Sequence, residues 1–459
     1  MASLNHAARD FCFRAFHGIV RKDGLIRCLN TFVVNERRPL VELERMQNQA
    51  VDELLRWATH EVPYYQSLAQ LGGIDISRAG GIERLQAFPL LDKSAIRTAG
   101  DSMFARSLPR SRGAANATSG STGESLRFYV DMQTKSSRAA ATYRFYRWCG
   151  ASPVSKHAKL WGARFDEQKS DDPRSRLRRW MHPELFLSSY RLAEHEMEEY
   201  AQRLLTFRPA LLTSYPSPLE HFARYCRDRR IVFPSLRAII TSAEQLLQDQ
   251  RRLVEEVFGV PIFDRYGSRE FGNVAQECER HDGLHVAIDN VFLEVVDQNG
   301  RPCAPGSAGE VIITDLRNLF MPFLRYRTGD IAVLSGESCR CGRSLPRLVK
   351  LEGRVFELIR TPSGQTISGT FWPQVVKQVS VDVRNFQVRQ DRGDHVRILL
   401  ETFSGLPVDD QCIAALEKRI LQFAPDLAID VEHVAEIPLS RAGKRLPVIV
   451  ETGAQGRPK

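Results

Sequence analysis

Long apolar runs are missing from this chain of 459 residues, and no window reaches the ~18 apolar residues of a membrane-spanning helix. The first residues, MASLNHAARDFCFRAFHGIVRKDG, scatter Arg, His and Asp among apolar positions, so the apolar core of a signal peptide is absent as well. Neither a repeat period nor a low-complexity tract occurs before the tail at 453–459. These absences exclude an integral membrane protein and a repeat architecture, and we expect a cytoplasmic location.

The excess of positive charge is small, because the chain has 64 Lys and Arg against 55 Asp and Glu, a net charge of +9. A nucleic-acid partner is not expected, since no recognisable module or strong basic stripe is present. The excess fits either a solvated surface or an attraction for polyanions such as nucleotides and coenzymes. The first forty residues mix Arg with Phe and Leu, so peripheral contact with a membrane or with a second subunit of a homodimer stays open. A basic cluster lies at Arg174, Arg176, Arg178 and Arg179.

Hydrophobic periodicity predicts an α/β protein of at least two domains, as this length requires. Apolar residues at helical spacing predict a helix over 41–61. Farther along, three predicted helices at 194–207, 218–229 and 247–258 separate short apolar strands at 211–214, 236–241 and 260–265. This alternation predicts a mostly parallel sheet covered by helices.

After residue 283 the pattern becomes strand-rich, with strand-like segments at 285–296 and 310–314. From about residue 355 a compact α+β module is predicted, with helices near Gln374 and over 409–423 and strands near Phe386 and Val396 and over 428–434. We therefore expect a large N-terminal body, residues 1–353, with mostly parallel sheets and a β-rich subdomain. A small mobile C-terminal domain would follow as residues 354–459.

The strongest local signal is a loop of glycines and hydroxyls that ends in Glu124. Such a loop lets the backbone approach an anion closely, although the Gly-Lys-Ser/Thr of a Walker motif is absent and a flexible turn has the same composition. The residues of this loop are Thr118, Ser119, Gly120, Ser121, Thr122 and Gly123.

Further motifs follow predicted strands, where open α/β sheets bind ligands. Thr241-Ser242-Ala243-Glu244 ends one strand, and Asp264-Arg265-Tyr266-Gly267-Ser268-Arg269-Glu270 ends the next. Arg325-Tyr326-Arg327-Thr328-Gly329-Asp330 and Glu352-Gly353-Arg354 come later. An aromatic ring at such an edge can stack on a base, and a carboxylate can hold Mg²⁺ or a ribose diol.

In this order the motifs resemble those of the AMP-forming adenylating superfamily, and more closely its phenylacetate–CoA ligase branch with relatives from capsular polysaccharide clusters. The resemblance spans about residues 55–447 and includes Val62-Pro63-Tyr64-Tyr65, Cys341-Gly342-Arg343-Ser344-Leu345-Pro346-Arg347 and Ser440-Arg441-Ala442-Gly443-Lys444-Arg445. It implies carboxylate activation by ATP with Mg²⁺, release of pyrophosphate and acyl transfer, with coenzyme A as the default acceptor.

The resemblance also implies roles for single residues. The 118–123 loop would cover the ATP phosphates, Ser242, Ala243 and Glu244 would line the adenine pocket beside Gly267, and Tyr266 would stack on the base. Glu270 would bind Mg²⁺ next to Arg269, a possible phosphate contact. Asp330 would hold the ribose, Arg354 would lie at the hinge, and Lys444 would stabilise the charge that forms at the α-phosphate. Without the resemblance, Lys444 would be an ordinary exposed lysine.

Three departures from the family pattern place the second half-reaction in doubt. Arg269 stands where a hydroxyl residue is usual, Glu124 stands where many relatives have Lys, and Val355-Phe356-Glu357 lacks the acidic pair common at the hinge. Transfer to an amine, such as an amino sugar or amino acid, is therefore the alternative activity. A nucleotide-binding partner protein without catalysis is the alternative of another class.

Among nine cysteines, Cys278, Cys339 and Cys341 form a separate pattern with His281. Three thiolates and one imidazole suit a closed structural Zn²⁺ site, with His285 as the alternative fourth ligand. Reduced thiols beside an unrelated histidine are the competing interpretation. The acyl pocket has no short motif, and Trp161, Phe165 and Tyr215 are either its lining or ordinary core residues.

Overall fold

The computed structural model forms two compact units, Met1–Thr328 with Val333–Lys350 and Gly329–Ala332 with Leu351–Lys459. No helix among its described residues is long and apolar enough to cross a membrane. The structure describes residues 2–77, 80–117, 126–161, 173–189, 192–354, 359–363, 366–367, 371–377, 382–392, 395–402, 404–438 and 446–450.

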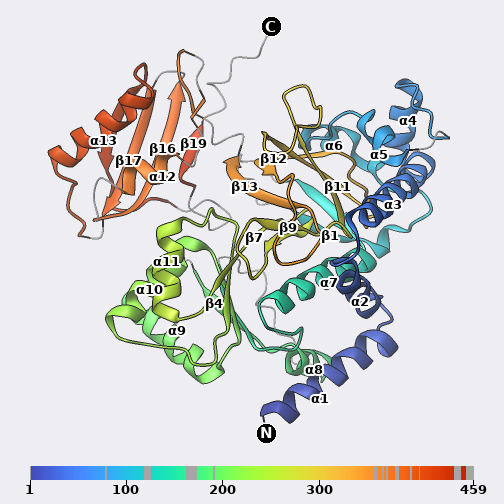
Figure 1. Ribbon diagram of the computed structural model, residues 1–459, viewed down its shortest axis with the longest axis horizontal. Coiled ribbons are helices and arrows are strands. Elements are labelled where there is room, and N and C mark those ends of the chain that lie inside the picture. The colour runs from blue at the N-terminus through green and yellow to red at the C-terminus, as the bar shows by residue number, and fades with distance from the viewer. Residues whose placement is uncertain are drawn as a thin grey trace. The chain divides into compact units, whose positions relative to one another are not determined.

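Among the described residues, eleven strands form one sheet in the order β10-β11-β12-β13-β9-β8-β7-β6-β5-β3-β4. Figure 1 labels β4, β7, β9, β11, β12 and β13 of this sheet. Its parallel part consists of β4 (Glu184–Ser188), β3 (His157–Trp161), β5 (Leu211–Ser214), β6 (Ala238–Ser242) and β7 (Ile262–Ser268). The remaining strands are β8 (Gly272–Glu277), β9 (Leu284–Val286), β10 (Val291–Val296), β11 (Ala308–Asp315), β12 (Tyr326–Leu334) and β13 (Arg347–Arg354). The predicted α/β fold is confirmed, and the strand-rich segment extends the same sheet.

The helices between the parallel strands bury one face each against the sheet. They are α9 (Glu194–Phe207), α10 (Pro216–Asp228) and α11 (Gln248–Phe258). Leu204, Phe222 and Val254 from these helices join Leu160 and Ile239 of the strands in one buried cluster. Burial of such side chains contributes roughly 1.5–3 kcal/mol each, which is why the apolar spacing alone predicted these elements.

One expected strand, residues 285–296, is interrupted in the structure. Backbone hydrogen bonds from Asn290 and Val291 to the Ala287 carbonyl form a turn between β9 and β10. In this turn the Asp289 carboxylate lies 2.6 Å from the Arg144 guanidinium and accepts a second hydrogen bond from Asn35. The turn is favoured because it supplies a partner for Arg144, whose side chain is fully buried.

The other helices of the first unit precede or flank the sheet. They include α1 (Ala2–Ala15), η1 (Phe16–Val20), α2 (Leu25–Asn35), α3 (Leu40–Glu61), α4 (Pro63–Leu71), α5 (Gly81–Gln86), α6 (Lys93–Ala99), η2 (Gly100–Met103), η3 (Arg110–Arg112), α7 (Met132–Trp148) and α8 (Pro173–Met181). A separate hairpin pairs β1 (Ala114–Ala117) with β2 (Arg127–Val130). The helix predicted at 41–61 is α3, whose buried face includes Leu43, Leu54 and Leu55.

The second unit has its own sheet in the order β18-β17-β16-β19 and its own core. Trp372, Ile398 and Ile420 are fully buried in it. Its elements are β14 (Ile359–Arg360), β15 (Thr366–Ile367), α12 (Phe371–Lys377), β16 (Val383–Arg392), β17 (His395–Thr402), α13 (Asp410–Phe423), β18 (Ala428–His433) and β19 (Val448–Val450). The predicted α+β module is confirmed, because these residues bury a core of their own.

Candidate functional site

The carboxyl ends of β5, β6 and β7 lie side by side at one edge of the sheet. Ser214 pairs with Thr241, and Ser242 pairs with Arg265. The Ser242 hydroxyl donates to the Arg265 carbonyl at 3.0 Å, which ties β6 to β7 one residue before Tyr266. The register therefore brings two separate sequence motifs to the same edge.

Strand β7 is irregular at this edge, because its pairing with β8 shifts between Tyr266 and Gly267. A Cβ atom on Gly267 would lie 2.5 Å from the Gly272 carbonyl oxygen, so no other residue fits without moving the backbone. Ala243, which follows β6, has a positive φ of 72°, a conformation that costs free energy in a residue with a Cβ. Such irregularities are common beside ligand sites because they change the direction of side chains.

Glu270 lies in the turn between β7 and β8 and is half-buried. The Tyr326 hydroxyl donates to its Oε1 atom at 3.1 Å. Tyr326 itself is 1% exposed, and its ring stacks on that of Phe323 with 5.3 Å between centroids. Packing thus holds the tyrosine that orients one oxygen of the Glu270 carboxylate. Tyr326 belongs to the Arg325–Asp330 motif, but no role for it followed from the sequence.

The Glu244 carboxylate makes a helix-capping contact that the sequence did not reveal. Its Oε2 atom accepts from the Ser217 backbone N–H at 3.0 Å and from the Ser217 hydroxyl at 2.7 Å. Ser217 is in the first turn of α10, where backbone N–H groups have no partner within the helix. Glu244 therefore joins the residues after β6 to the start of α10.

The structure describes only some of the other residues that are predicted to contact the nucleotide. Arg269 is exposed, and its carbonyl accepts from the Asn116 side chain at 3.5 Å. Asp330 is half-buried on β12, and the backbone of Arg354 ends β13. The 118–123 loop and Lys444 lie outside the described residues, as does Phe165. Their expected roles stay predictions.

Two aromatic residues of the predicted acyl pocket lie together at the ends of β3 and β5. The rings of Trp161 and Tyr215 have centroids 4.0 Å apart. Tyr215 is buried, whereas Trp161 is partly exposed. The pair therefore combines a core residue with one that solvent reaches.

The half-buried Asp264 of β7 lies beside Thr241 of β6, just before this edge. Asp264 Oδ1 accepts from the Thr241 hydroxyl at 2.8 Å, and the Asp264 backbone N–H donates to Glu277. Burial and the nearby Glu277 carboxylate together raise the pKa of Asp264 to about 6, against the opposing effect of the hydrogen bond from Thr241. Around neutral pH the protonated fraction of this carboxyl is therefore larger than that of an ordinary aspartate.

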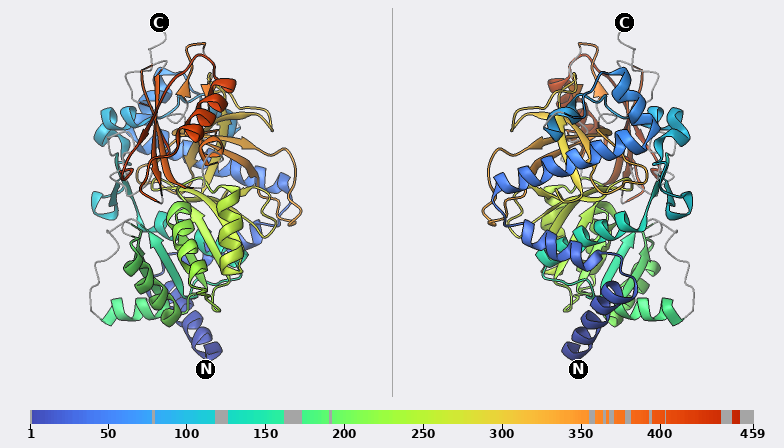
Figure 2. Two further views of the ribbon diagram at one scale, coloured as in Figure 1. Left: turned by 90° about the vertical axis from the view of Figure 1, so that its left-hand side faces the viewer. Right: turned by 90° about the vertical axis from the view of Figure 1, so that its right-hand side faces the viewer.

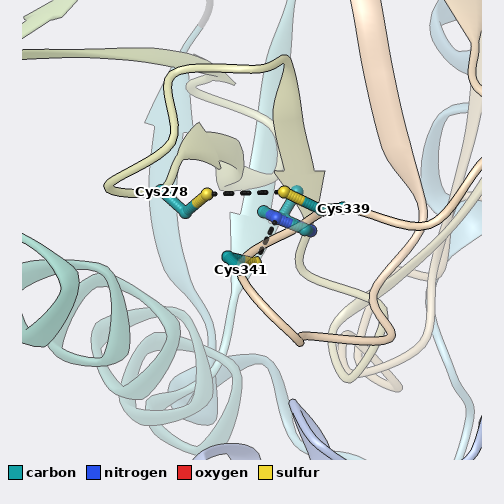
Figure 3. A group of neighbouring side chains, drawn as sticks. Cys278, Cys339 and Cys341 are labelled. Atoms are coloured by element: carbon teal, nitrogen blue, oxygen red, sulfur yellow. Dashed lines mark hydrogen bonds between the residues drawn. The ribbon is translucent and has the colours of Figure 1, made fainter.

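The predicted cysteine pattern comes together as a group of four side chains (Figure 3). The Cys278 and Cys339 sulfurs are 3.8 Å apart, and Cys341 Sγ is 3.3 Å from His285 Nε2. All four ligand atoms lie within 4.8 Å of one another. Tetrahedral zinc with bonds of about 2.3 Å to sulfur requires sulfur separations of about 3.8 Å, so the spacing fits this metal.

The histidine of this group is His285 and not His281, which the sequence favoured. His281 Nδ1 instead contacts Glu277 Oε2 at 3.0 Å, and its ring packs against Phe263. His285 lies in β9, where pairing with Arg347 of β13 brings it next to the cysteine-bearing loop. The alternative fourth ligand is therefore the one that the fold selects.

Hydrogen bonds around the cysteine group favour the binding of a cation. His285 Nδ1 donates to the Leu345 carbonyl at 3.1 Å, which leaves Nε2 as the acceptor facing the sulfurs. Burial lowers the pKa of His285 to about 4, so the imidazole is neutral at pH 7. The backbone N–H groups of Arg280 and Arg343 point at the sulfurs of Cys278 and Cys341, at 3.5 and 3.4 Å.

The pKa values of the Cys278 and Cys341 thiols shift in opposite directions. Burial raises the pKa of Cys278 to about 12. Burial also acts on Cys341, but hydrogen bonds from Arg343, Cys339 and Cys278 together outweigh it and lower the pKa of that thiol. A bound cation would deprotonate coordinating thiols, including Cys278.

Residues around the cysteine group link it to the N-terminal helices. The Trp148 indole donates to Glu36 Oε2 at 2.9 Å, and its ring lies 5.7 Å from that of His285. The Arg343 guanidinium lies over the same indole at 4.7 Å. The Ser344 backbone N–H donates to the Glu36 carbonyl at 2.9 Å. Glu36 and Trp148 therefore hold the cysteine loop against α7 and the end of α2.

Comparison with known proteins gives relatives over most of the chain, although no family model matches. The chain is 28% identical to the phenylacetate–coenzyme A ligase of Thermus thermophilus over 350 residues, 71% of this chain and 73% of the relative. With the Escherichia coli phenylacetate–coenzyme A ligase it shares 26% identity over 374 residues, 77% of this chain and 80% of the relative. The chain is a homologue of phenylacetate–coenzyme A ligases. The resemblance seen in its motifs is confirmed.

Solved structures show the same fold at lower identity. A 2-hydroxyisobutyryl-CoA ligase in the postadenylation state, in complex with 2-HIB-AMP, superposes with a TM-score of 0.73 and 19% identity, covering 91% of this chain and 92% of that one. An anthranilate CoA ligase in complex with anthranoyl-AMP gives 0.56 and 15%, covering 79% and 74%. The fold of this phenylacetate–CoA ligase homologue is thus that of the adenylate-forming ligases.

Proposed function

We propose that the protein is an AMP-forming carboxylate ligase, which activates an acid with ATP to an acyl-adenylate and transfers the acyl group to coenzyme A. The observation that carries this proposal is the placement of Ser242, Tyr266 and Glu270 at one strand edge, in a homologue of CoA ligases. Displacement of pyrophosphate concentrates negative charge, so the site must neutralise phosphates and exclude water.

The predicted site residues have distinct tasks in this proposal. Tyr266 stacks on the adenine, Asp330 binds the ribose hydroxyls, and the 118–123 loop covers the phosphates. Glu270, oriented by Tyr326, holds Mg²⁺, which supplies positive charge beside the phosphate oxygens when bound. Lys444 stabilises the charge at the α-phosphate as the acid attacks.

The acceptor is coenzyme A in this proposal because the chain's homologues are named as CoA ligases. The sequence Val355-Phe356-Glu357, which lacks the usual acidic pair after Arg354, favours an amine as the alternative acceptor. In this proposal residues 354–459 form the C-terminal domain, and its rotation would separate acyl-adenylate formation from acyl transfer.

A structural Zn²⁺ ion bound by Cys278, His285, Cys339 and Cys341 completes the proposal. The donor set suits zinc because three sulfurs and an imidazole converge at tetrahedral spacing, and His285 is fixed in the tautomer that presents Nε2. All four positions are protein side chains, which is typical of structural sites and leaves no place for a catalytic water. The ion would pin the segment after β8 to the loop before β13.

The proposal is tested by ATP–pyrophosphate exchange with a panel of aryl, fatty, hydroxy and amino acids. Exchange that depends on one acid, and that Lys444→Ala abolishes while ATP still binds, is the expected result. Product analysis with coenzyme A and with amines then identifies the acceptor. ATP binding without exchange for any acid would favour the non-catalytic nucleotide-binding alternative.

A further inference from the structure

Helix α1 and its continuation η1 turn an apolar face to solvent. Phe13 is 1% exposed and packs with Leu25 and Val154, which defines the inner side of the helix. Helical spacing places Phe11 and Ile19 on the other side, where they are 73% and 70% exposed. A surface helix ordinarily has the opposite arrangement, with its apolar stripe toward the core.

Some polar side chains of α1 and η1 contact neighbouring elements, while Arg14 is exposed and pairs with Asp10 at 2.8 Å. His6 Nε2 contacts the Ser152 hydroxyl at 2.9 Å, and His17 Nδ1 contacts Asp23 at 2.8 Å. The Arg9 guanidinium lies 5.9 Å from the centre of the Trp180 ring of α8. Phe11, Ile19 and Val20 are thus exposed although this segment also has polar residues.

Helix α8 lies beside α1 and adds cations to this region (Figures 1 and 2). Every residue from Arg176 to Trp180 is exposed, and this run contains three arginines, Leu177 and no acid. After η1, Arg21 and Lys22 are exposed as well. We call the following set the basic apolar face: Phe11, Arg14, Ile19, Val20, Arg21, Lys22, Arg176, Leu177, Arg178, Arg179 and Trp180.

We propose that the basic apolar face docks the protein on the surface of an anionic membrane. Arginines would contact lipid phosphates while Phe11, Leu177 and Trp180 enter the boundary between headgroups and acyl chains. A second copy of the chain fits less well, because its basic apolar face would bring like charges together. A nucleic acid would leave the apolar residues without a partner. The inference is independent of the proposed ligase activity.

The test is flotation of the full-length protein with vesicles of phosphatidylcholine alone and of phosphatidylcholine mixed with phosphatidylglycerol. We expect binding to the mixed vesicles only, weakening as salt rises. Replacing two arginines, in Arg178→Gln/Arg179→Gln, should weaken partitioning about 10-fold or more. Phe11→Ser should weaken it at every salt concentration, since it removes buried apolar area.

A charge-matched control is Arg227→Gln/Arg252→Gln, which removes two exposed arginines from α10 and α11. This control should bind vesicles like the parent, and equal thermal unfolding of all variants would show that they fold. Absence of binding to anionic vesicles, or equal loss in the control, would overturn the proposal. So would a dimer in light scattering that Phe11→Ser dissociates, because the face would then belong to a second copy.

Discussion

The hydroxyl of Tyr326 donates a hydrogen bond to the carboxylate of Glu270 across 56 residues of sequence, at 3.1 Å. Tyr326 begins β12, and Glu270 lies in the turn after β7. The tyrosine is held by Phe323 and Phe271, whose ring centroids lie 5.3 and 5.6 Å from its own. A buried aromatic cluster therefore fixes the orientation of the proposed magnesium ligand.

Tyr326→Phe removes only this hydroxyl and keeps the ring packing. If Tyr326 orients Glu270, the Mg²⁺ concentration for half-maximal pyrophosphate exchange should rise about 5-fold, since one hydrogen bond contributes about 1 kcal/mol. The matched control is Tyr65→Phe, which removes a buried hydroxyl that donates to the Pro322 carbonyl at 2.9 Å. That control should lose stability without a change in Mg²⁺ dependence. The same Mg²⁺ dependence in both variants would assign Tyr326 a structural role alone.

Zinc content should distinguish His285 from His281. His285→Gln should weaken metal retention against a chelator at least about 10-fold, because it removes one of four ligands. His281→Gln should retain the metal like the parent, since His281 contacts Glu277 instead. Elemental analysis of protein purified without chelator measures both. Metal-free parent protein would contradict the zinc site, and loss only in His281→Gln would restore the first expectation.

The contact between Glu244 and Ser217 should appear as a coupled pair in stability measurements. Glu244→Ala and Ser217→Ala should each lower the free energy of unfolding of the first unit by about 1 kcal/mol. The double variant should lose less than the sum, because Glu244→Ala already removes the carboxylate to which the Ser217 hydroxyl donates. Thermal unfolding of the four proteins measures this coupling. Weaker ATP binding in Glu244→Ala alone would support the adenine-pocket role that the resemblance implies.

Asp264 should make the protein less stable as pH rises. Its pKa is raised to about 6 in the folded state, so the folded protein holds this proton more tightly than the unfolded chain does. The favourable contribution is complete below the unfolded pKa and is lost as pH rises through about 6.

Asp264→Asn should therefore be more stable than the parent by about 1–2 kcal/mol at about pH 7.5, with a smaller advantage at about pH 5. The control Asp249→Asn changes an exposed carboxylate at the start of α11 and should show no such trend. Chemical unfolding at the two pH values measures the difference. An advantage that grows toward low pH would contradict the raised pKa.

Many helices and strands of this protein could be predicted from the sequence, because residues close together in the chain are enough to indicate them. The helix predicted at 194–207 is α9, and the strand predicted at 211–214 is β5. Both elements depend on apolar periodicity over neighbouring residues, which the core then buries. The interruption of 285–296 was missed because the partner that favours the turn, Arg144, is far away in sequence.

The candidate site was predictable only as a set of motifs. Their order along the chain indicated the phenylacetate–CoA ligase branch, which the relatives confirm. The contacts of individual side chains did not follow from that order. Glu244 caps α10 through Ser217, and no spacing rule relates two residues that are separated by helix α10 and strand β6.

The sequence by itself determined the helices and strands with clear apolar periodicity, the ligase-like motifs and the three cysteines of the metal-binding group. Tertiary structure decided which histidine joins those cysteines and which tyrosine orients Glu270. The physical reason is strand pairing: the register of β9 against β13 brings His285 to Cys341, although His281 is closer to Cys278 in the sequence. Sequence spacing records distance along the chain, whereas metal ligands and hydrogen bonds depend on distance in space.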